Sequence, residues 1–184
     1  MDEIMAEPAE KLMTVDEFLR WDDGTDARHE LIDGQIVAMA PPSRQLGTVA
    51  MNVGSLINGR MRDRAPCHAE GEAGIVVSEK RRWQADVVLT CQAMEANAVD
   101  PILIVEVLSP STRSRDFADK LPDYKALPSV QEIWLVDSER RSAQVWWREP
   151  EGWHGRDHVG GGGFRSEVLA GEVELDELYR NAGL

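Results

Sequence analysis

Glu106 is the one charged side chain in an otherwise apolar run, residues 102–108. Large aliphatic side chains at consecutive positions are typical of a central strand that is covered on both faces. A carboxylate in such a strand costs several kcal/mol if it is buried, ionised and unpaired. Buried acids are therefore usually paired, protonated or bound to a metal, and the fold of this chain must supply one of these solutions for Glu106.

Hydrophobic periodicity and turn residues predict the other elements. Thr14 and Glu17 match a capping box, and Asp33-Gly34 is typical of a two-residue hairpin turn. The expected elements are a short helix after residue 14, a hairpin of residues 29–32 and 35–39, a helix over 46–64, strands over 74–78, 85–90 and 102–108, a helix over 112–127, strands over 132–136 and 143–147, and a closing helix over 175–181. This order predicts an α/β fold in which a mixed sheet is flanked by helices.

The length of 184 residues, with 42% hydrophobic residues, suits a single domain over residues 14–184, after a flexible lead-in of residues 1–13. No apolar run approaches the roughly 20 residues that a membrane helix needs. Cys67 and Cys91 are too few for a disulfide framework, which indicates a reducing, cytoplasmic setting.

Asp86 opens a second strand-like run, twenty residues before Glu106. That separation allows two neighbouring strands joined by a polar connection. Two carboxylates that converge on one point form the hard oxygen site that Mg²⁺ prefers. The alternative for each acid is an ion pair or a cap at a strand end.

Asp116, Lys120 and Tyr124 share one face of the helix that follows the Glu106 strand. Lys120 can therefore turn back toward the two acids, where a lysine orients an attacking water and stabilises charge on a phosphate. The alternative is an ordinary surface pair between Asp116 and Lys120. Pro122 bends this helix in either case, because proline removes a backbone hydrogen bond.

Taken together, these motifs resemble the Uma-type family of bacterial "putative restriction endonucleases", within the PD-(D/E)XK nuclease superfamily. The resemblance covers roughly residues 14–140 and implies a restriction endonuclease-like three-layer core, with an N-terminal helix and β-hairpin added to it. The motifs that carry it are His29 to Gly34, Ala85-Asp86, Glu106 to Ser111, the set Asp116, Lys120 and Tyr124, and Glu132 to Asp137.

By this resemblance, Asp86 and Glu106 hold a divalent metal, Mg²⁺ with Mn²⁺ as a substitute, and the backbone carbonyl of Val107 is a further ligand. Lys120 replaces the lysine that most of the superfamily carries at the position of Leu108. The implied reaction is hydrolysis of DNA phosphodiester bonds by metal-activated water.

The resemblance also assigns accessory roles to Glu30, as an acid near the metal, and to Tyr124. One departure concerns the residues after the Pro-Pro-Ser segment, where family members often carry a histidine and this chain has none from Arg44 to Gly47. That departure favours an alternative: a catalytically weak or inactive nuclease-fold module for binding or assembly.

The net charge of −13 argues against tight, nonspecific binding to nucleic acid. The acidic excess lies at the two ends of the chain, because residues 44–125 carry equal numbers of acidic and basic side chains. Basic clusters there include Arg60, Arg62 and Arg64, and leave a local DNA-binding surface possible, while a metal hydrolase of small phosphoesters is a further alternative. A homodimer is expected, because two sites related by a twofold axis suit the cutting of two strands.

Overall fold

The computed structural model describes residues 12–93 and 99–184. Most of the predicted lead-in lies outside these residues, although the backbone N–H of Met13 already donates to the carbonyl of Gly34 at 2.7 Å. The elements in chain order are α1 (Val15–Phe18), β1 (His29–Ile32), β2 (Gln35–Ala38), α2 (Arg44–Met61), β3 (His68–Ser78), β4 (Arg81–Thr90), β5 (Pro101–Leu108), α3 (Arg113–Arg115), η1 (Asp116–Lys120), α4 (Leu121–Ala126), β6 (Glu132–Asp137), β7 (Ser142–Glu149), β8 (Gly152–Val159), β9 (Gly163–Ser166), β10 (Gly171–Glu174) and α5 (Leu175–Leu178).

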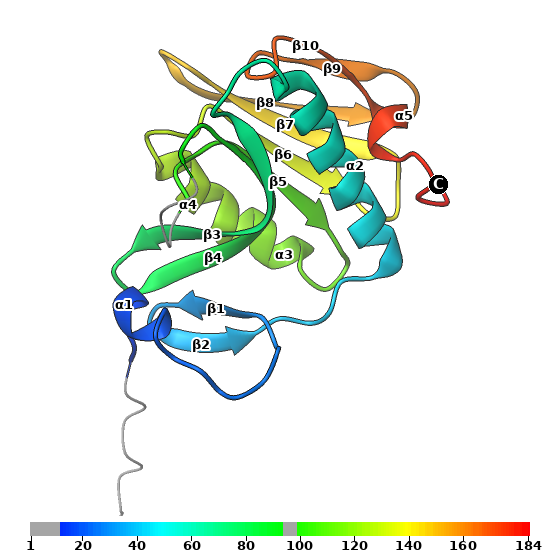
Figure 1. Cartoon of the computed structure of the whole chain (residues 1–184). Coiled ribbons are helices and arrows are strands. Elements are labelled where there is room, and N and C mark those ends of the chain that lie inside the picture. The colour runs from blue at the N-terminus through cyan, green and yellow to red at the C-terminus, as the bar shows by residue number, and fades with distance from the viewer. Residues whose placement is uncertain (1–11, 94–98) are drawn as a thin grey trace, which may run out of the picture.

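An eight-stranded mixed sheet organises the fold (Figure 1). Its strand order is β2-β1-β4-β5-β6-β7-β8, with β3 also paired to β4, and β9 and β10 form a separate two-stranded sheet. The pairing of β5 with β6 is parallel, and the other pairs are antiparallel. Helices α2 and α5 pack against one face of the sheet, and α4 packs against the other. The predicted α/β fold with a mixed sheet between helices is confirmed.

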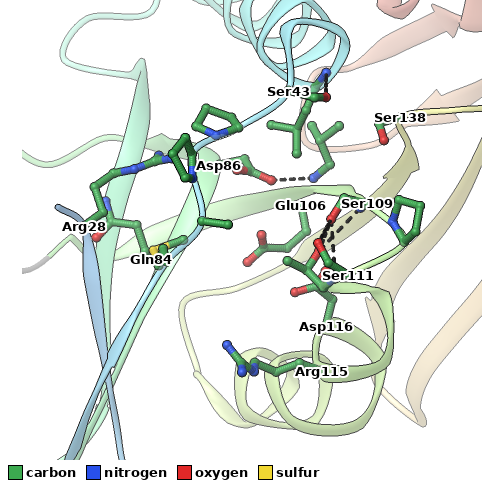
Figure 2. Close-up of a pocket in the computed structure, with 18 of the residues that line it drawn as sticks. Arg28, Ser43, Gln84, Asp86, Glu106, Ser109, Ser111, Arg115, Asp116 and Ser138 are labelled. Carbon is green, nitrogen blue, oxygen red and sulfur yellow. Dashed lines mark hydrogen bonds between the residues drawn. The ribbon is translucent and has the colours of Figure 1, made fainter.

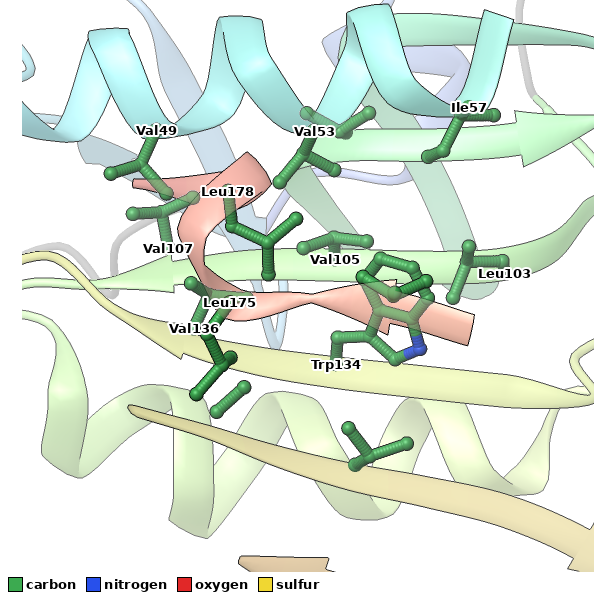
Figure 3. Packing of buried hydrophobic residues seen from close by; sticks show 14 of the residues in the cluster. Val49, Val53, Ile57, Leu103, Val105, Val107, Trp134, Val136, Leu175 and Leu178 are labelled. Atoms are coloured by element: carbon green, nitrogen blue, oxygen red, sulfur yellow. The ribbon is translucent and has the colours of Figure 1, made fainter. Parts of the chain in front are cut away.

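Strand β5 divides its side chains between the two faces, as a central strand must. Val105 and Val107 point toward α2, where they join the larger hydrophobic core (Figure 3). Ile104 and Leu108 belong to the second core, beneath α4. Glu106 alternates with the first pair, and therefore its carboxylate lies on the α4 side of the sheet.

Two different strands, β1 and β5, pair with the same edge of β4. They pair with different parts of that edge, so a gap lies between them. β1 pairs with β4 at Arg82, while β5 pairs with it only from Val87 onward. Between these points, at residues 84–86, neither β1 nor β5 forms a ladder pair with β4 among the described residues. The backbone groups in this fork need other partners, because buried N–H and C=O groups are seldom left unpaired.

The N-terminal predictions are confirmed. Thr14 caps α1 in a capping box with Glu17. β1 and β2 form the predicted hairpin, and its turn residues Asp33 and Gly34 have φ values of 51° and 85°. These positive values explain the Asp-Gly pair, because both central positions of this turn require them.

The predicted helix over 112–127 is present as three consecutive helical segments, α3, η1 and α4. η1 is a π-helical turn in which the N–H of Leu121 donates to the carbonyl of Asp116, five residues back. Pro122 follows in the first turn of α4, where its missing N–H costs least. The sequence analysis expected a bend at Pro122. The structure instead has a π-helical turn just before this proline.

The C-terminal third departs most from the sequence prediction. β8, β9 and β10 were not predicted, and α5 ends at Leu178 rather than near residue 181. β8 is mostly exposed and lacks apolar alternation, so it forms by pairing with β7 rather than by its own pattern. Gly155 is required there, since a Cβ would lie 2.6 Å from the ring of Trp146.

Cys67 and Cys91 are joined by a disulfide, which the sequence analysis did not expect. The bond links the residue before β3 to the residue after β4. Across residues 12–93 and 99–184, none of the helices is long and apolar enough to cross a bilayer.

Candidate functional site

A pocket of 520 Å³ opens at the fork between β1 and β5. Its walls come from β4, β5, the loop before α2 and the segment from Ser109 to Lys120 (Figure 2). Asp86 and Glu106 both face this pocket, as do Arg28, Arg115 and Asp116. The sequence-predicted acids therefore meet at one place.

The strand register explains why Asp86 and Glu106 meet. Val87 pairs with Val105, and the same register continued by one residue brings Asp86 opposite Glu106. Opposite residues of antiparallel strands project from the same face, about 5 Å apart at Cβ. The ladder opens at this point, because the backbone N–H of Val107 donates to Oδ2 of Asp86 at 2.6 Å. Burial raises the pKa of Asp86, against the opposing effect of this hydrogen bond.

Glu106 is only 3% exposed, and its Oε1 atom receives two hydrogen bonds. The hydroxyl of Tyr124 donates at 2.6 Å and the ammonium of Lys120 at 3.2 Å. Burial raises the pKa of Glu106 well above its ordinary value, although Lys120 opposes this. Within the described residues, every hydrogen bond of Glu106 uses Oε1, so Oε2 is the oxygen left for a ligand.

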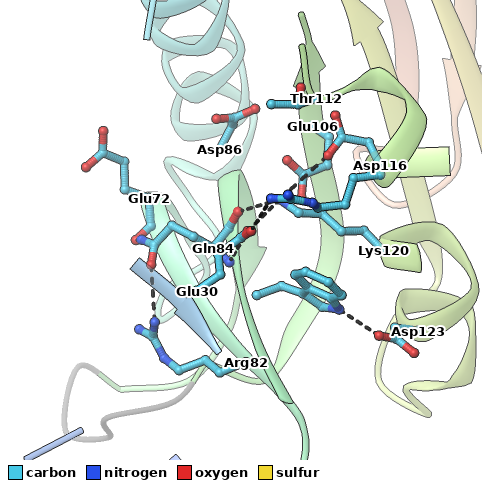
Figure 4. Close-up of polar contacts among 12 residues, drawn as sticks. Glu30, Glu72, Arg82, Gln84, Asp86, Glu106, Thr112, Asp116, Lys120 and Asp123 are labelled. Carbon is cyan, nitrogen blue, oxygen red and sulfur yellow. Dashed lines mark hydrogen bonds and ion pairs between the residues drawn. The ribbon is translucent and has the colours of Figure 1, made fainter. Parts of the chain in front are cut away.

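Lys120 is the buried cation of the site (Figure 4). Its Nζ donates to the carbonyl of Gln84 at 2.9 Å and lies 3.0 Å from Oε1 of Glu30 and 3.8 Å from Oδ1 of Asp116. Burial alone would lower the pKa of Lys120, but the carboxylates of Glu106, Glu30 and Asp116 outweigh it and hold that pKa above the ordinary value. Lys120 is therefore a permanent ammonium at neutral pH.

Glu30 completes the fork from the β1 side. Its Oε1 accepts the backbone N–H of Gln84 at 3.2 Å, and its Oε2 lies 3.5 Å from Nη1 of Arg115. The backbone N–H and C=O of Gln84, which no strand pairs on this edge, are thus satisfied by Glu30 and Lys120. The gap in strand pairing at Gln84 is therefore where the side chains of Glu30 and Lys120 bind the backbone.

The sequence analysis placed Asp116 on one helical face with Lys120 and Tyr124, and it kept a surface pair between Asp116 and Lys120 as the alternative. Asp116 is 2% exposed and faces the pocket, which does not fit a surface pair. Burial raises its pKa, in opposition to Lys120. The spacing of Asp116 and Lys120 carried the signal, but their burial depends on the π-helical turn.

Three carboxylates, Glu30, Glu106 and Asp116, therefore lie next to the buried ammonium of Lys120, and the carboxylate of Asp86 faces the same pocket. Two further cations lie at the rim of the pocket. Arg28 pairs with Glu72 at 2.6 Å, and the side chain of Arg115 is 42% exposed. Counted as ionised, the four carboxylates outnumber the three cations Lys120, Arg28 and Arg115.

Several arginines between residues 44 and 125 have internal partners. Arg81 pairs with Asp33 and Asp123, and Arg113 pairs with Asp137. Arg60 donates to the carbonyl of Glu172 at 2.8 Å. These arginines stabilise the fold and contribute little net positive charge to the surface.

A second group of potential metal ligands lies on the β7–β8 hairpin. Glu149, Glu151 and His154 can bring one ligand atom each within 4.8 Å of one another. All three side chains are exposed, and exposed acidic groups of this kind seldom need an ion. The pocket at the fork is the better candidate, because its acids are held by the fold.

Comparisons with known proteins agree with this geometry. A family model, Uma2, described as "Putative restriction endonuclease", matches residues 15–176. The uncharacterized protein slr1290 of Synechocystis is 27% identical over 176 residues, which cover 91% of this chain and 92% of that protein. A second uncharacterized Synechocystis protein, sll1609, is 27% identical over 141 residues, or 69% of this chain and 76% of that one.

A crystal structure described as "a putative nuclease" from Anabaena variabilis is similar in fold. It superposes with a TM-score of 0.74 at 19% sequence identity, and the match covers 91% of this chain and 97% of that one. At this level of identity the similarity concerns the fold alone.

Proposed function

The chain belongs to the Uma2 family of proteins described as "Putative restriction endonuclease", and from that premise we propose that it is a metal-dependent endonuclease acting on DNA phosphodiester bonds. The observation that carries the proposal is the pocket that gathers four carboxylates, three of them in contact with the buried ammonium of Lys120. A purely structural cluster would be expected to balance its charges, because unpaired buried charge is costly.

Asp86 and Glu106 are the proposed ligands of a divalent metal. Their described hydrogen bonds use Oδ2 of Asp86 and Oε1 of Glu106, which leaves one oxygen of each for a cation. Carboxylate oxygens suit Mg²⁺, and Mn²⁺ as its substitute. The raised pKa values of both acids fit this assignment, since a cation would relieve the repulsion that their burial intensifies. Val107 lines the pocket, and its backbone carbonyl is the proposed third protein ligand.

A bound divalent metal lowers the pKa of its water and polarises a phosphoryl oxygen. The protein groups do the rest of the work in this proposal. Lys120, fixed by Gln84 and Glu30, presents a positive charge to the oxygens of the phosphate as their charge increases in the transition state. Tyr124 orients Glu106 through its hydroxyl, and Arg28 and Arg115 offer rim contacts for neighbouring phosphates.

The second candidate is a metal hydrolase of small phosphoesters. It is favoured by one observation, namely that Arg60, Arg81 and Arg113 are occupied by internal partners. A small substrate needs no extended basic surface. The third candidate is a weak or inactive module with a nuclease fold. It predicts the same structure but no metal-dependent hydrolysis of DNA or of small phosphoesters.

Cleavage of supercoiled plasmid in Mg²⁺ or Mn²⁺ separates the endonuclease from the other two candidates. The endonuclease proposal predicts nicked and linear products with the wild type and none with Asp86→Ala. Glu132→Gln, which changes a buried acid outside the pocket, should retain the activity. The proposal is wrong if supercoiled, linear and single-stranded DNA all remain intact with the wild type.

The homodimer and the cytoplasmic location stay predictions. Sedimentation of the purified protein in the presence of Mg²⁺ tests the dimer directly. A dimer is expected because a second copy supplies a second site for the opposite strand.

A further inference from the structure

An apolar groove of 390 Å³ runs beside most of α2, from Leu46 to Asn58, and meets the acidic pocket. Arg28, Pro42, Leu46 and Asp86 line both the groove and the pocket. We call this feature the α2 groove, and its remaining walls are formed by Gly47, Ala50, Met51, Gly54, Ser55, Asn58, Ala69, Gly71, Glu72 and Val87.

The lining of the α2 groove is largely apolar. Met51 is 75% exposed on a helix whose other large aliphatic side chains are mainly buried or half-buried. Gly47 and Gly71 leave the walls open, since a Cβ at either would touch almost nothing. Asn58 uses its Oδ1 atom to accept the N–H of Ala69 at 2.8 Å, which leaves its amide NH₂ as a donor at the surface. Apolar walls with a few polar groups are the usual composition of a small-ligand site.

The cations available near the pocket restrict which form of nucleic acid can bind in this groove. A duplex is bound mainly through its phosphates, and the internal partners of Arg60, Arg81 and Arg113 reduce the number of cations available for such contacts. Single-stranded nucleic acid adds contacts between protein side chains and the faces of unpaired bases to its phosphate contacts. The volume of 390 Å³ is near the lower end for ligand sites, which fits one nucleoside better than a base pair.

We propose that the α2 groove binds an unpaired nucleobase and its sugar next to the phosphate held in the acidic pocket. The substrate would then be single-stranded, or a duplex from which one nucleotide has been turned out of the stack. This inference rests on the proposed nuclease function, and it adds that the strand is recognised through a base as well as through its phosphate.

Gly47 and Gly59 provide a matched pair of substitutions. Both lie in α2, and a Cβ built at either finds no atom within 4 Å, but only Gly47 lines the groove. Gly47→Leu therefore narrows the groove, and Gly59→Leu adds the same side chain elsewhere. Both variants should unfold at the wild-type temperature or above it, because leucine is a better helix former than glycine.

The binding assay uses fluorescence anisotropy with a labelled ten-nucleotide oligothymidylate and an abasic strand of the same length, in Ca²⁺. The wild type and Gly59→Leu should bind the oligothymidylate about tenfold more tightly than the abasic strand. Gly47→Leu should bind both strands equally. The groove proposal is overturned if the wild type does not distinguish the strands, or if Gly47→Leu keeps the wild-type preference.

Plasmid and oligonucleotide cleavage by the same proteins separates this result from the nuclease proposal. DNA cleavage together with an unchanged base preference in Gly47→Leu overturns the groove assignment and keeps the nuclease. Base-dependent binding without any cleavage overturns the nuclease and keeps the groove as a nucleic-acid site.

Discussion

Glu106 and Glu132 are buried glutamates on the neighbouring parallel strands β5 and β6, and their surroundings differ sharply. Glu132 accepts hydrogen bonds from the indole of Trp134 at 2.7 Å, the hydroxyl of Ser166 at 3.0 Å and the N–H of Val168 at 3.2 Å. All three donors are neutral, and the ion pairs among the described residues do not include Glu132. Glu106 instead shares one ammonium with Glu30 and Asp116.

The comparison shows that burial of a carboxylate does not by itself mark a functional site. Burial raises the pKa of both acids. Glu132 is fully used by the fold, because it ties the segment after β9 to β6. Glu106 keeps one oxygen free beside three other acids, and this surplus of negative charge is what a cation would neutralise.

The largest expected effect concerns catalysis. Glu106→Gln should lower the rate of DNA cleavage by at least about 10³-fold, since loss of a metal ligand removes several kcal/mol of transition-state stabilisation. Glu132→Gln should cleave at a rate within a few-fold of the wild type. Rates of plasmid nicking measure the effect of each substitution. Equal losses of rate in the two variants would contradict the claim that only Glu106 belongs to the active site.

The next effect concerns stability and the cation of the site. Lys120→Met should lower the free energy of unfolding by about 3–5 kcal/mol at neutral pH, because it leaves Glu30, Glu106 and Asp116 without their shared ammonium. Lys125→Met is the control on the same helical segment, since Lys125 is only partly buried and lies over the ring of Trp146. Urea unfolding measures the difference, and similar stabilities of the two variants would contradict it.

Glu132→Gln should have a smaller effect on stability, about 1–3 kcal/mol. The amide oxygen can still accept from Trp134, but the NH₂ group cannot accept from Ser166 and Val168. Glu106→Gln should not destabilise the metal-free protein in this way, because it reduces the repulsion among four acids. A metal-free Glu106→Gln protein that is less stable than Glu132→Gln would show that the pocket acids serve the fold.

The smallest effect is the pH dependence of the Glu132→Gln difference. Burial raises the pKa of Glu132 in the folded protein above the ordinary value of 4.5, despite its hydrogen bonds. The folded state therefore binds a proton that the unfolded state has lost, and this stabilisation falls as pH rises from 4.5 through the raised pKa. Urea unfolding should show a larger cost of Glu132→Gln near pH 5 than near pH 8, and a cost that grows with pH would contradict this.

The sequence predicted the core of the sheet well, for physical reasons that local pattern can carry. An apolar run such as residues 102–108 predicts a central strand, and Glu106 is easily recognised as the one charged residue in it. The hairpin at Asp33-Gly34 and the capping box at Thr14 are equally local signals. The match of the family model to residues 15–176 confirms the resemblance that these motifs indicated.

The rest depended on contacts between distant segments. Asp116 is buried within a π-helical turn that the sequence did not predict, and the role of the Gln84 backbone follows from the divergence of β1 and β5 along β4. β8 has no hydrophobic pattern of its own and is ordered by β7. Partners on separate elements, such as Arg81 of β4 with Asp123 of α4, likewise cannot be assigned from charge clusters in the sequence.

Calorimetric titration with Mn²⁺ and Mg²⁺ tests the central claim, that Asp86 and Glu106 together hold a divalent metal. The wild type and Glu132→Gln should bind the metal with the same affinity, while Asp86→Ala and Glu106→Gln should each lose measurable binding. An affinity in Glu106→Gln equal to that of the wild type would contradict the claim and reduce the cluster to a buried polar network.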